Sequence, residues 1–347
     1  MAERISVIGD LFMLSDVFEQ SIRKACPDFD IDIRKFDLPW PDQPMEHGYA
    51  SPGLSGLKEY MGRAEDIVPL ADGASMLVTH LAPLSRSMME QLPDLRFVAV
   101  SRGGPVNIDM IAAHERGLRV VNAPGRNATA VAEFTIGAIL AETRNITRGH
   151  DALRRGQWRG DLYRADMVGP ELSELTIGII GYGEIGRRVV ILLKAFGARI
   201  VVCDPYVQLT ADDLRDGVTQ VSFDRLLGEA DVVSLHPRVT PETTGMINAA
   251  ALARMKQGTY LINTARGPLV DLDALHDALI SGRLRGAMLE TFATEPIDPS
   301  SPLLKLDNVT LTPHIAGASR RTVKYAADLV AHEVRRYLAQ EPPLNPC

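Results

Sequence analysis

The chain has few cysteines, no net positive charge and no long hydrophobic run. Its 347 residues include only three cysteines, Cys26, Cys203 and Cys347, which lie far apart and show no C-x-x-C spacing. This pattern excludes a disulfide framework and a zinc ribbon, so we expect no metal site and a reducing, cytoplasmic location. Cys203 lies within an apolar stretch and is expected to be a small core residue.

Two further absences limit the possible partners. No apolar run approaches the roughly 20 residues needed to cross a bilayer, and the N-terminus lacks the basic start and apolar core of a signal peptide. The net charge of −7 argues against non-specific nucleic-acid binding, which needs positive patches. We therefore expect no membrane and no nucleic acid as partner, and a small molecule instead.

A glycine-rich loop at residues 176–186, TIGIIGYGEIG, is the most informative motif present. An apolar strand is expected to lead into it and a helix over residues 184–196 to follow. A second apolar run, residues 199–204, then ends in an acid, Asp204. The order of strand, G-x-G-x-x-G, helix, strand and acid is that of a dinucleotide-binding site.

Each glycine of the loop has a physical role in such a site. Gly181 permits the tight turn, Gly183 lets backbone amides approach a pyrophosphate, and Gly186 allows close packing of the helix on the strand. The helix N-terminus offers N–H groups and the positive end of its dipole. Asp204 is placed to accept hydrogen bonds from a ribose diol and, with no arginine beside it, favours NAD over NADP. The alternative is that Asp204 only caps the end of a strand.

Strands and helices alternate along the chain, which predicts parallel sheets covered on both faces. In the first third, strands are expected at residues 5–8, 31–36, 75–79, 95–100 and 118–122, and helices near 15–25, 54–65, 85–91 and 108–116. The stretch 37–53 is expected to be an irregular surface excursion. A second series of strands is expected near 176–181, 199–204, 231–235, 259–264, 286–291 and 308–312, followed by a helix over 319–338.

The predicted fold is therefore α/β, with two doubly wound parallel-sheet, Rossmann-like domains and an active-site cleft between them. Residues 1–122 plus 318–347 are expected to form a flavodoxin-like substrate (catalytic) domain, because the last helix can return to the first domain. Residues 123–317 are expected to form the NAD-binding domain, which includes a connecting helix over 129–155.

Three polar side chains are expected at the carboxyl ends of successive strands: Arg266, Glu295 and His314. A guanidinium binds a carboxylate in bidentate fashion and polarises the adjacent carbonyl, and a histidine gives a proton to the carbonyl oxygen. A carboxylate beside the imidazolium keeps it charged and oriented. Taken singly, the three are equally compatible with a surface ion pair, a helix cap and a buried hydrogen-bonding histidine. Their joint placement beside a nucleotide site favours catalysis.

The chain resembles the D-isomer specific 2-hydroxyacid dehydrogenase family, including its phosphoglycerate and glyoxylate-hydroxypyruvate reductase-like members. The resemblance covers most of the chain and is strongest from Leu95 to Gly317. It rests on several motifs in the same order: NID at 107–109, the APGRN and VAE segments at 123–133, GYGEIG, NTARGPLVD, TFATEP and TPHIAG.

The family pattern implies a role for each matching residue. Arg266 would bind and polarise the 2-oxo acid, His314 would be the general acid/base, and Glu295 would be its charged partner. The amides of Arg102, Gly103 and Gly104 would hold the substrate carboxylate. Contacts to NAD would come from Gly181, Gly183, Glu184, Ile185, Gly186, Asp204, Thr264, Ala265, Arg266, Glu290, His314, Ala316 and Gly317.

Two positions depart from the family pattern. Glu290 stands where the family usually has aspartate, which puts the ribose or nicotinamide contact there in question. The segment 101–107, SRGGPVN, replaces the more common G-x-G-x-D-N form. Our hypothesis is that Arg102 or the loop at His80 recognises a second anionic or polar group of the substrate. The alternative is that Arg102 points to solvent.

The leading hypothesis is an NAD-dependent oxidoreductase that interconverts a D-2-hydroxy acid and its 2-oxo acid. An alternative is an NAD(H)-sensing, corepressor-like interaction protein on the same scaffold, and a third is formate or phosphite oxidation. Pro313, where formate dehydrogenases carry glutamine, argues against formate. Family precedent implies a homodimer joined through the nucleotide domains.

Overall fold

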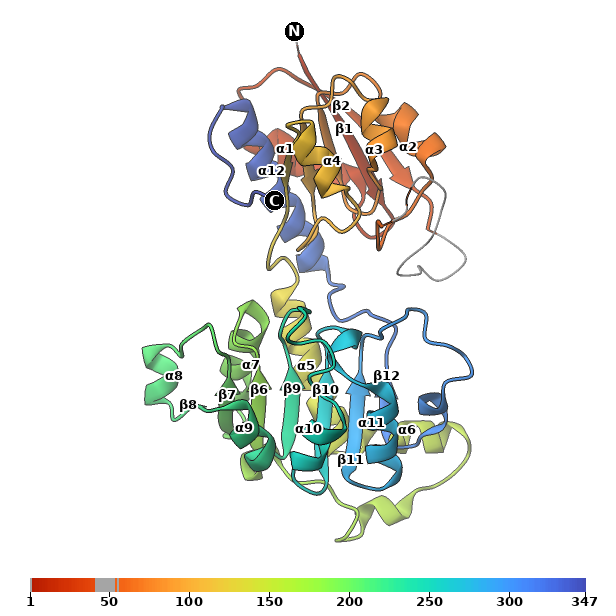
Figure 1. The fold of residues 1–347 in the computed structure, drawn as a ribbon, viewed down its shortest axis with the longest axis vertical. Coiled ribbons are helices and arrows are strands. Elements are labelled where there is room, and N and C mark those ends of the chain that lie inside the picture. The colour runs from red at the N-terminus through yellow and green to blue at the C-terminus, as the bar shows by residue number, and fades with distance from the viewer. Residues whose placement is uncertain (1, 41–53, 55) are drawn as a thin grey trace. The chain divides into compact units, whose positions relative to one another are not determined.

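The computed structural model describes residues 2–40, 54 and 56–347. The chain divides into two compact units, one of Met1–Arg126 with Ala318–Cys347 and one of Asn127–Gly317. Each unit contains one parallel β-sheet with helices packed on it (Figure 1). The predicted fold class of two parallel-sheet α/β domains is confirmed.

The first unit is built on a five-stranded sheet in the order β2-β1-β3-β4-β5. All strand pairs are parallel. The order reverses between β1 and β3, as in the flavodoxin-like arrangement, and ligands of such sheets bind at that reversal. The strands are β1 (Glu3–Asp10), β2 (Ile31–Leu38), β3 (Met76–Thr79), β4 (Phe97–Val100) and β5 (Arg119–Val121).

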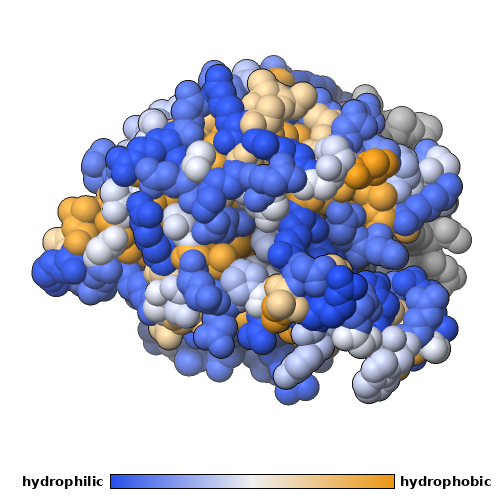
Figure 2. Space-filling view, turned by 90° about the horizontal axis from the view of Figure 1, so that it is seen from below, coloured by the Kyte–Doolittle hydropathy of each residue, from blue (hydrophilic) through white to orange (hydrophobic). Residues whose placement is uncertain are grey.

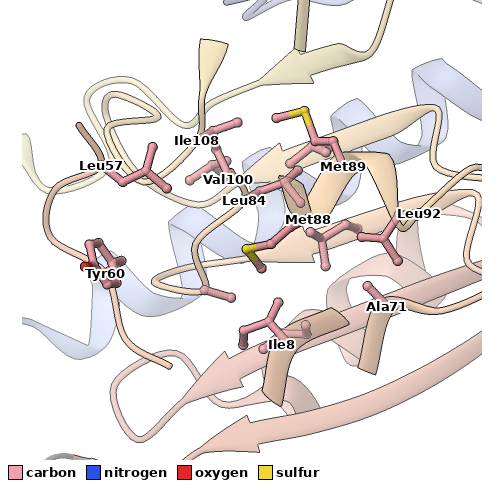
Figure 3. Packing of buried hydrophobic residues seen from close by; sticks show 14 of the residues in the cluster. Ile8, Leu57, Tyr60, Ala71, Leu84, Met88, Met89, Leu92, Val100 and Ile108 are labelled. Carbon is pink, nitrogen blue, oxygen red and sulfur yellow. The ribbon is translucent and has the colours of Figure 1, made fainter. Parts of the chain in front are cut away.

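Helices cover both faces of this sheet. One face packs against α1 (Ser15–Ala25) and the C-terminal helix α12 (Arg320–Leu338), which contact each other. The other face packs against α2 (Ala64–Ala71), α3 (Arg86–Glu90) and α4 (Met110–Glu115). Figure 3 shows Ile8 and Val100 of the sheet with Met88 and Met89 of α3 in this second core.

The second unit contains a seven-stranded sheet in the order β12-β11-β10-β9-β6-β7-β8, again with every pair parallel. Its order reverses between β6 and β9, which is the Rossmann arrangement. The strands are β6 (Thr176–Ile180), β7 (Arg199–Cys203), β8 (Thr219–Gln220), β9 (Val232–Leu235), β10 (Thr259–Asn263), β11 (Leu284–Leu289) and β12 (Val309–Leu311). The two-residue strand β8 was not predicted, because it is too short to show an apolar pattern.

Two hydrophobic cores hold this sheet between layers of helices. On one face lie α5 (Ala128–Thr143) and α7 (Glu184–Lys194), and on the other α9 (Phe223–Glu229), α10 (Ala249–Arg254) and α11 (Leu272–Ile280). The remaining helices are α6 (Ile146–Arg154), α8 (Ala211–Arg215) and the short 3₁₀ turns Gly160–Tyr163, Leu172–Glu174, Gly267–Leu269 and Pro302–Lys305.

Two predicted helices differ from the structure. The helix predicted over 54–65 is wrong: the described residues there are irregular until α2 begins at Ala64. Gly56 and Gly62 have φ of +88° and +92°, a backbone conformation that an α-helix does not contain. The single connecting helix predicted over 129–155 is instead α5 and α6, separated at Asn145, whose φ is +55°. Asparagine tolerates this conformation better than most residues.

The irregular excursion predicted over 37–53 falls mainly on residues 41–53, outside the described part of the chain; β2 continues through Leu38. Among the described residues, no helix combines the length and the apolar character that a bilayer crossing requires. The face of the molecule in Figure 2 is mainly hydrophilic, and its hydrophobic residues form small separate groups.

A buried carboxylate joins three elements of the second unit. Glu142 of α5 is 3% exposed. It accepts hydrogen bonds from the hydroxyl of Thr310 on β12 and from Arg148 of α6. Burial raises the pKa of Glu142 to about 7, although both partners oppose the shift. The protonated form is therefore favoured in the folded state well above the pH at which an exposed glutamate ionises.

We predict that Glu142→Gln makes the protein more stable than the wild type at alkaline pH but not at pH 4. The unfolded glutamate ionises near 4.5 and the folded one near 7, so the wild type loses stability as the pH rises through this window. At about 1.4 kcal/mol per unit, the relative loss is on the order of 3 kcal/mol. Urea denaturation at pH 4 and pH 8 measures it. Glu229→Gln is the control, because ion pairing lowers the pKa of Glu229; a similar profile for both variants would contradict the prediction.

Candidate active site

The glycine-rich loop joins β6 to α7 at the point where the strand order of the second unit reverses. Gly181 has φ of +90°, and a Cβ there would lie 2.8 Å from the His236 carbonyl carbon. A Cβ on Gly186 would lie 2.1 Å from the Gly181 oxygen, so the helix packs closely on the turn. Gly183 precedes α7, is exposed, and has open space where its Cβ would be. The loop thus has room for a phosphate at the helix N-terminus.

Asp204 directly follows β7 and lies against this loop. Its Oδ2 accepts a hydrogen bond from the Tyr182 amide at 2.7 Å, and its Oδ1 accepts from the amides of Tyr206 and Val207 at 2.8 and 3.0 Å. These amides fix the carboxylate beside the glycine turn. The same hydrogen bonds are expected under the alternative that Asp204 only caps the end of the strand. A dinucleotide with its pyrophosphate at Gly183 and its ribose at Asp204 fits this arrangement of residues.

The glycine-rich loop is anchored by a hydrogen-bond network around Asp213, which the sequence analysis did not predict. Tyr182 is 1% exposed, and its hydroxyl donates a hydrogen bond to Asp213. Asp213 also accepts hydrogen bonds from Lys194 and Thr210, each at 2.5 Å. The sequence feature that could have indicated this network is the tyrosine of G-Y-G, because a side chain of that size between two loop glycines can reach a distant partner.

Arg266, Glu295 and His314 follow the neighbouring strands β10, β11 and β12. The structure places His314 Nδ1 2.8 Å from Glu295 Oε2. The other carboxylate oxygen of Glu295 accepts a hydrogen bond from the Phe292 amide at 2.8 Å. The His314 side chain is 30% exposed and that of Glu295 is 11% exposed, so an accessible imidazole is backed by a largely buried acid.

Arg266 belongs to the same group. Although its side chain reaches solvent, the surrounding protein lowers the pKa of the guanidinium, and the nearby Glu295 carboxylate opposes this. The Arg266 guanidinium therefore stays cationic at neutral pH. Asn263, which the sequence analysis did not single out, holds the turn: its side chain donates to the Arg266 carbonyl at 2.9 Å and accepts from the Ala265 amide at 3.1 Å.

Glu290 supports the segment that carries His314. It is 1% exposed, and its two oxygens accept hydrogen bonds from the Thr312 hydroxyl and, at 2.5 Å, from the Ala316 amide. The His314 amide also donates to the Glu290 carbonyl at 3.0 Å. Both carboxylate oxygens are therefore engaged by the turn around His314, and the contact from Glu290 to the cofactor stays a prediction.

The other predicted cofactor residues lie along the same carboxyl edge of the sheet. Thr264 is buried and shares a hydrogen bond of 2.8 Å with Thr135 of α5. Gly317 lies against Asn127, whose Nδ2 would be 2.6 Å from a Cβ at that position. Ala265 and Ala316 are buried, Ile185 is half-buried, and Glu184 is exposed and pairs with Arg188 at 2.6 Å.

In the first unit, the predicted substrate loop of Arg102, Gly103 and Gly104 follows β4. Arg102 does not point freely to solvent: its side chain is 14% exposed and forms an ion pair with Glu59. His80 is buried and has its Nδ1 2.7 Å from Asp10 Oδ2. A Cβ added to Gly103 or Gly104 would meet no atom within 4 Å, and the two residues are exposed and partly exposed.

The comparison with known proteins agrees with this geometry. Residues 136–316 match the model of the family described as "D-isomer specific 2-hydroxyacid dehydrogenase, NAD binding domain". A glyoxylate reductase of Thermofilum pendens is 36% identical over 304 residues, which are 84% of this chain and 90% of the relative. The chain belongs to the D-isomer specific 2-hydroxyacid dehydrogenase family.

Other members of this family extend the likeness. A D-3-phosphoglycerate dehydrogenase of Mycobacterium leprae is 40% identical over 274 residues, which are 79% of this chain but 50% of that protein. The chain therefore matches about half the length of that relative. The solved structure of a D-2-hydroxyisocaproate dehydrogenase aligns over 99% of both chains with a TM-score of 0.80 and 26% identity.

As a D-2-hydroxyacid dehydrogenase, the protein is an NAD-dependent oxidoreductase that interconverts a D-2-hydroxy acid and its 2-oxo acid. The predictions of the family, the reaction class and the cofactor NAD are confirmed. The assignment of individual residues to the substrate and the cofactor stays a prediction.

We predict that Gly186→Ala weakens NADH binding. The new Cβ would lie 2.1 Å from the Gly181 oxygen, so the turn must shift away from the helix N-terminus. Overpacking of this kind costs about 1–3 kcal/mol, equivalent to roughly five- to 150-fold in affinity where the cost falls on the bound state. Fluorescence titration with NADH measures the effect. Gly228→Ala in α9 is the matched control, because its Cβ would meet no atom within 4 Å. A folded Gly186→Ala protein with wild-type affinity would disprove the steric argument.

Proposed function

We propose that His314 is the general acid/base of the dehydrogenase. In the direction of 2-oxo acid reduction it gives a proton to the carbonyl oxygen, and in the reverse direction it takes the proton from the hydroxyl. Nδ1 of the ring is engaged by Glu295 at 2.8 Å, so we assign proton transfer to the opposite nitrogen, Nε2. This His314–Glu295 hydrogen bond, beside Arg266 on the adjoining strand end, is the observation on which the proposal rests.

Glu295 orients the imidazole through its hydrogen bond to Nδ1. A carboxylate that accepts a hydrogen bond from Nδ1–H fixes the tautomer and holds the ring in one orientation. The Phe292 amide engages the other oxygen of Glu295 and prevents the carboxylate from rotating away. Glu290 acts one step further back, as a positioning residue for the turn that carries His314.

Arg266 binds and polarises the substrate. A guanidinium is always charged and offers donors in a planar fork, which suits the carboxylate and the adjacent carbonyl of a 2-oxo acid. Asn263 and the Ala265 carbonyl hold the Arg266 turn from behind. In the first unit, the backbone amides of Arg102, Gly103 and Gly104 bind the substrate carboxylate, supported by the exposed or partly exposed backbone of this loop.

Bound NAD supplies the hydride acceptor, and NADH the hydride donor, at C2 of the substrate. We propose that the cofactor is held by the glycine loop, by Asp204 and by the strand-end residues from Thr264 to Arg266 and from His314 to Gly317. Asp204 disfavours NADP, because a 2′-phosphate would face a carboxylate there. The similarity to a glyoxylate reductase over most of both chains makes glyoxylate and hydroxypyruvate the first substrates to measure.

The protein is proposed to act in the cytoplasm, where the NAD(H) pool serves dehydrogenases, and as a homodimer joined through the NAD-binding units. Exposed apolar side chains on α6 and the segment after it support the dimer. Among them Trp158 is 84% exposed and Tyr163 is 94% exposed, and they are accompanied by Ile146, Leu153 and Val168. Such side chains on one continuous segment are typical of an interface.

We predict that His314→Ala lowers kcat by about 100-fold or more, because general acid catalysis contributes that much. NADH affinity should fall much less, because the glycine loop, Asp204 and the other strand-end residues still hold the cofactor. Glu295→Gln should give a smaller loss of kcat, since the amide keeps a hydrogen bond but not the charge. NADH-oxidation assays and fluorescence titration measure both. His276→Ala, a histidine of α11 in the same unit, is the control. Wild-type turnover in His314→Ala would refute the proposed role.

We predict that the double substitution Trp158→Asp with Tyr163→Asp converts the dimer to a monomer. Two carboxylates on the apolar segment would have to be buried in the interface without partners. Light scattering coupled to size-exclusion chromatography measures the mass. Leu214→Asp on α8 is the control, since Leu214 is also exposed, at 58%, but lies on another element. A dimer that persists in the double variant places the interface elsewhere.

A further inference from the structure

A chain of three polar side chains lies at the carboxyl edge of the sheet in the first unit. Asp10 ends β1 and His80 directly follows β3, the two strands between which the strand order reverses. Arg126 comes from the segment after β5 and is hydrogen-bonded to His80. Ligands of open α/β sheets bind at this reversal. Burying polar groups is costly unless hydrogen bonds or ion pairs compensate for the lost hydration.

The hydrogen bonds fix the state of each group. Asp10 is fully buried, and its Oδ1 accepts from the amides of Phe12 and Met13 at 2.8 and 2.9 Å. Its Oδ2 lies 2.7 Å from His80 Nδ1, and His80 Nε2 lies 3.1 Å from Arg126 Nη2. A guanidinium only donates, so Nε2 must be the acceptor and the proton must be on Nδ1. His80 is therefore neutral, in agreement with burial that lowers its pKa.

Arg126 is left with a donor to satisfy. Its Nη1 is buried and has no hydrogen-bond partner among the described residues. Burial lowers the pKa of Arg126 to about 10, so the guanidinium is still charged at neutral pH. An unsatisfied buried donor is destabilising, and more so on a charged group. The residue as a whole is partly exposed.

The segment before Arg126 is tied to the loop proposed to bind the substrate carboxylate. The Ala123 amide donates to the Arg102 carbonyl at 2.7 Å, and Asn122 Nδ2 donates to the Gly103 carbonyl at 3.0 Å. Arg102 itself is engaged with Glu59. Arg126 thus combines a fixed position with an unsatisfied donor next to this loop.

We propose that Arg126 binds an anionic oxygen of the substrate through Nη1, while Asp10 and His80 hold its guanidinium in position. The inference rests on the proposed function as a 2-oxo acid reductase and adds a residue that recognises substrate charge. The oxygen belongs either to the carboxylate common to all 2-oxo acids or to a second acidic group further along the substrate. A charged donor pre-positioned in this way favours anions over neutral analogues.

Steady-state kinetics of Arg126→Gln test the proposal. Glutamine keeps an N–H donor for His80 Nε2 but removes the charge, so the fold is preserved better than in Arg126→Met. The substrates are a matched five-carbon pair, 2-oxopentanoate and 2-oxoglutarate, which differ in a second carboxylate, together with glyoxylate and hydroxypyruvate. Arg116→Gln is the matched control, because Arg116 is exposed and precedes β5 at the opposite edge of the sheet.

The expected result is a rise in KM of about tenfold or more in Arg126→Gln, the effect of losing a charge-assisted hydrogen bond, with a much smaller change in kcat. Arg126→Lys should recover part of the affinity. A rise for every substrate assigns the contact to the common carboxylate, and a rise for 2-oxoglutarate alone assigns it to a second acidic group. An unchanged KM for all substrates, or the same change in Arg116→Gln, overturns the proposal.

Failure of this inference is distinct from failure of the proposed function. If the wild type reduces no 2-oxo acid, or if His314→Ala keeps full turnover, the proposed function fails. If the wild type is active and Arg126→Gln binds its substrates normally, only the role of Arg126 fails. Thermal unfolding and NADH titration of each variant show whether both units are folded before the kinetics are compared.

Discussion

Parallel strand pairing is the constraint on which the active site depends. Asn263 of β10 pairs with Leu289 of β11, and Leu289 pairs with Leu311 of β12. Three consecutive strands thus end at one level of the sheet, although their ends are up to 48 residues apart in the sequence. Arg266 and His314 each come three residues after these partners, and Glu295 comes six residues after Leu289. A one-residue slip in this register would turn each strand over and separate the imidazole from its acid.

Much of the fold and of the candidate site was predictable, because local sequence patterns determine it. Apolar runs that end in a chemically active residue gave the strands and the strand-end residues, and G-x-G-x-x-G gave the nucleotide turn. The errors came where a distant contact or a backbone conformation decides the structure. The turns at Gly56 and Gly62 and the break at Asn145 depend on positive φ values, which helical periodicity does not register. The partners of Tyr182 and Arg126 lie 31 and 46 residues away, so no local pattern pairs them.

The two units contain the same pair of residue types in different surroundings. In each, a histidine Nδ1 lies within 2.8 Å of a carboxylate at the carboxyl edge of a parallel sheet. His314 is 30% exposed, whereas His80 is 6% exposed, and a guanidinium occupies the other nitrogen of His80. A histidine in the second setting is held neutral and serves as an acceptor. The two histidine–acid pairs therefore differ in solvent access and in the third partner, and the different roles proposed for them rest on this difference.

Glu290 illustrates how a departure from a family pattern gains a physical explanation. From the sequence, the additional methylene only put a cofactor contact in question. In the structure the longer side chain, buried at the end of β11, reaches two points of the next strand's turn, the Thr312 hydroxyl and the Ala316 amide, which lie on either side of His314. The His314 residue itself has φ of +54°, a conformation that a non-glycine residue adopts only when its surroundings determine it. A buried carboxylate that holds both flanks of this residue supplies that determination. Glu290 therefore fixes the position of His314, the residue proposed to transfer the proton.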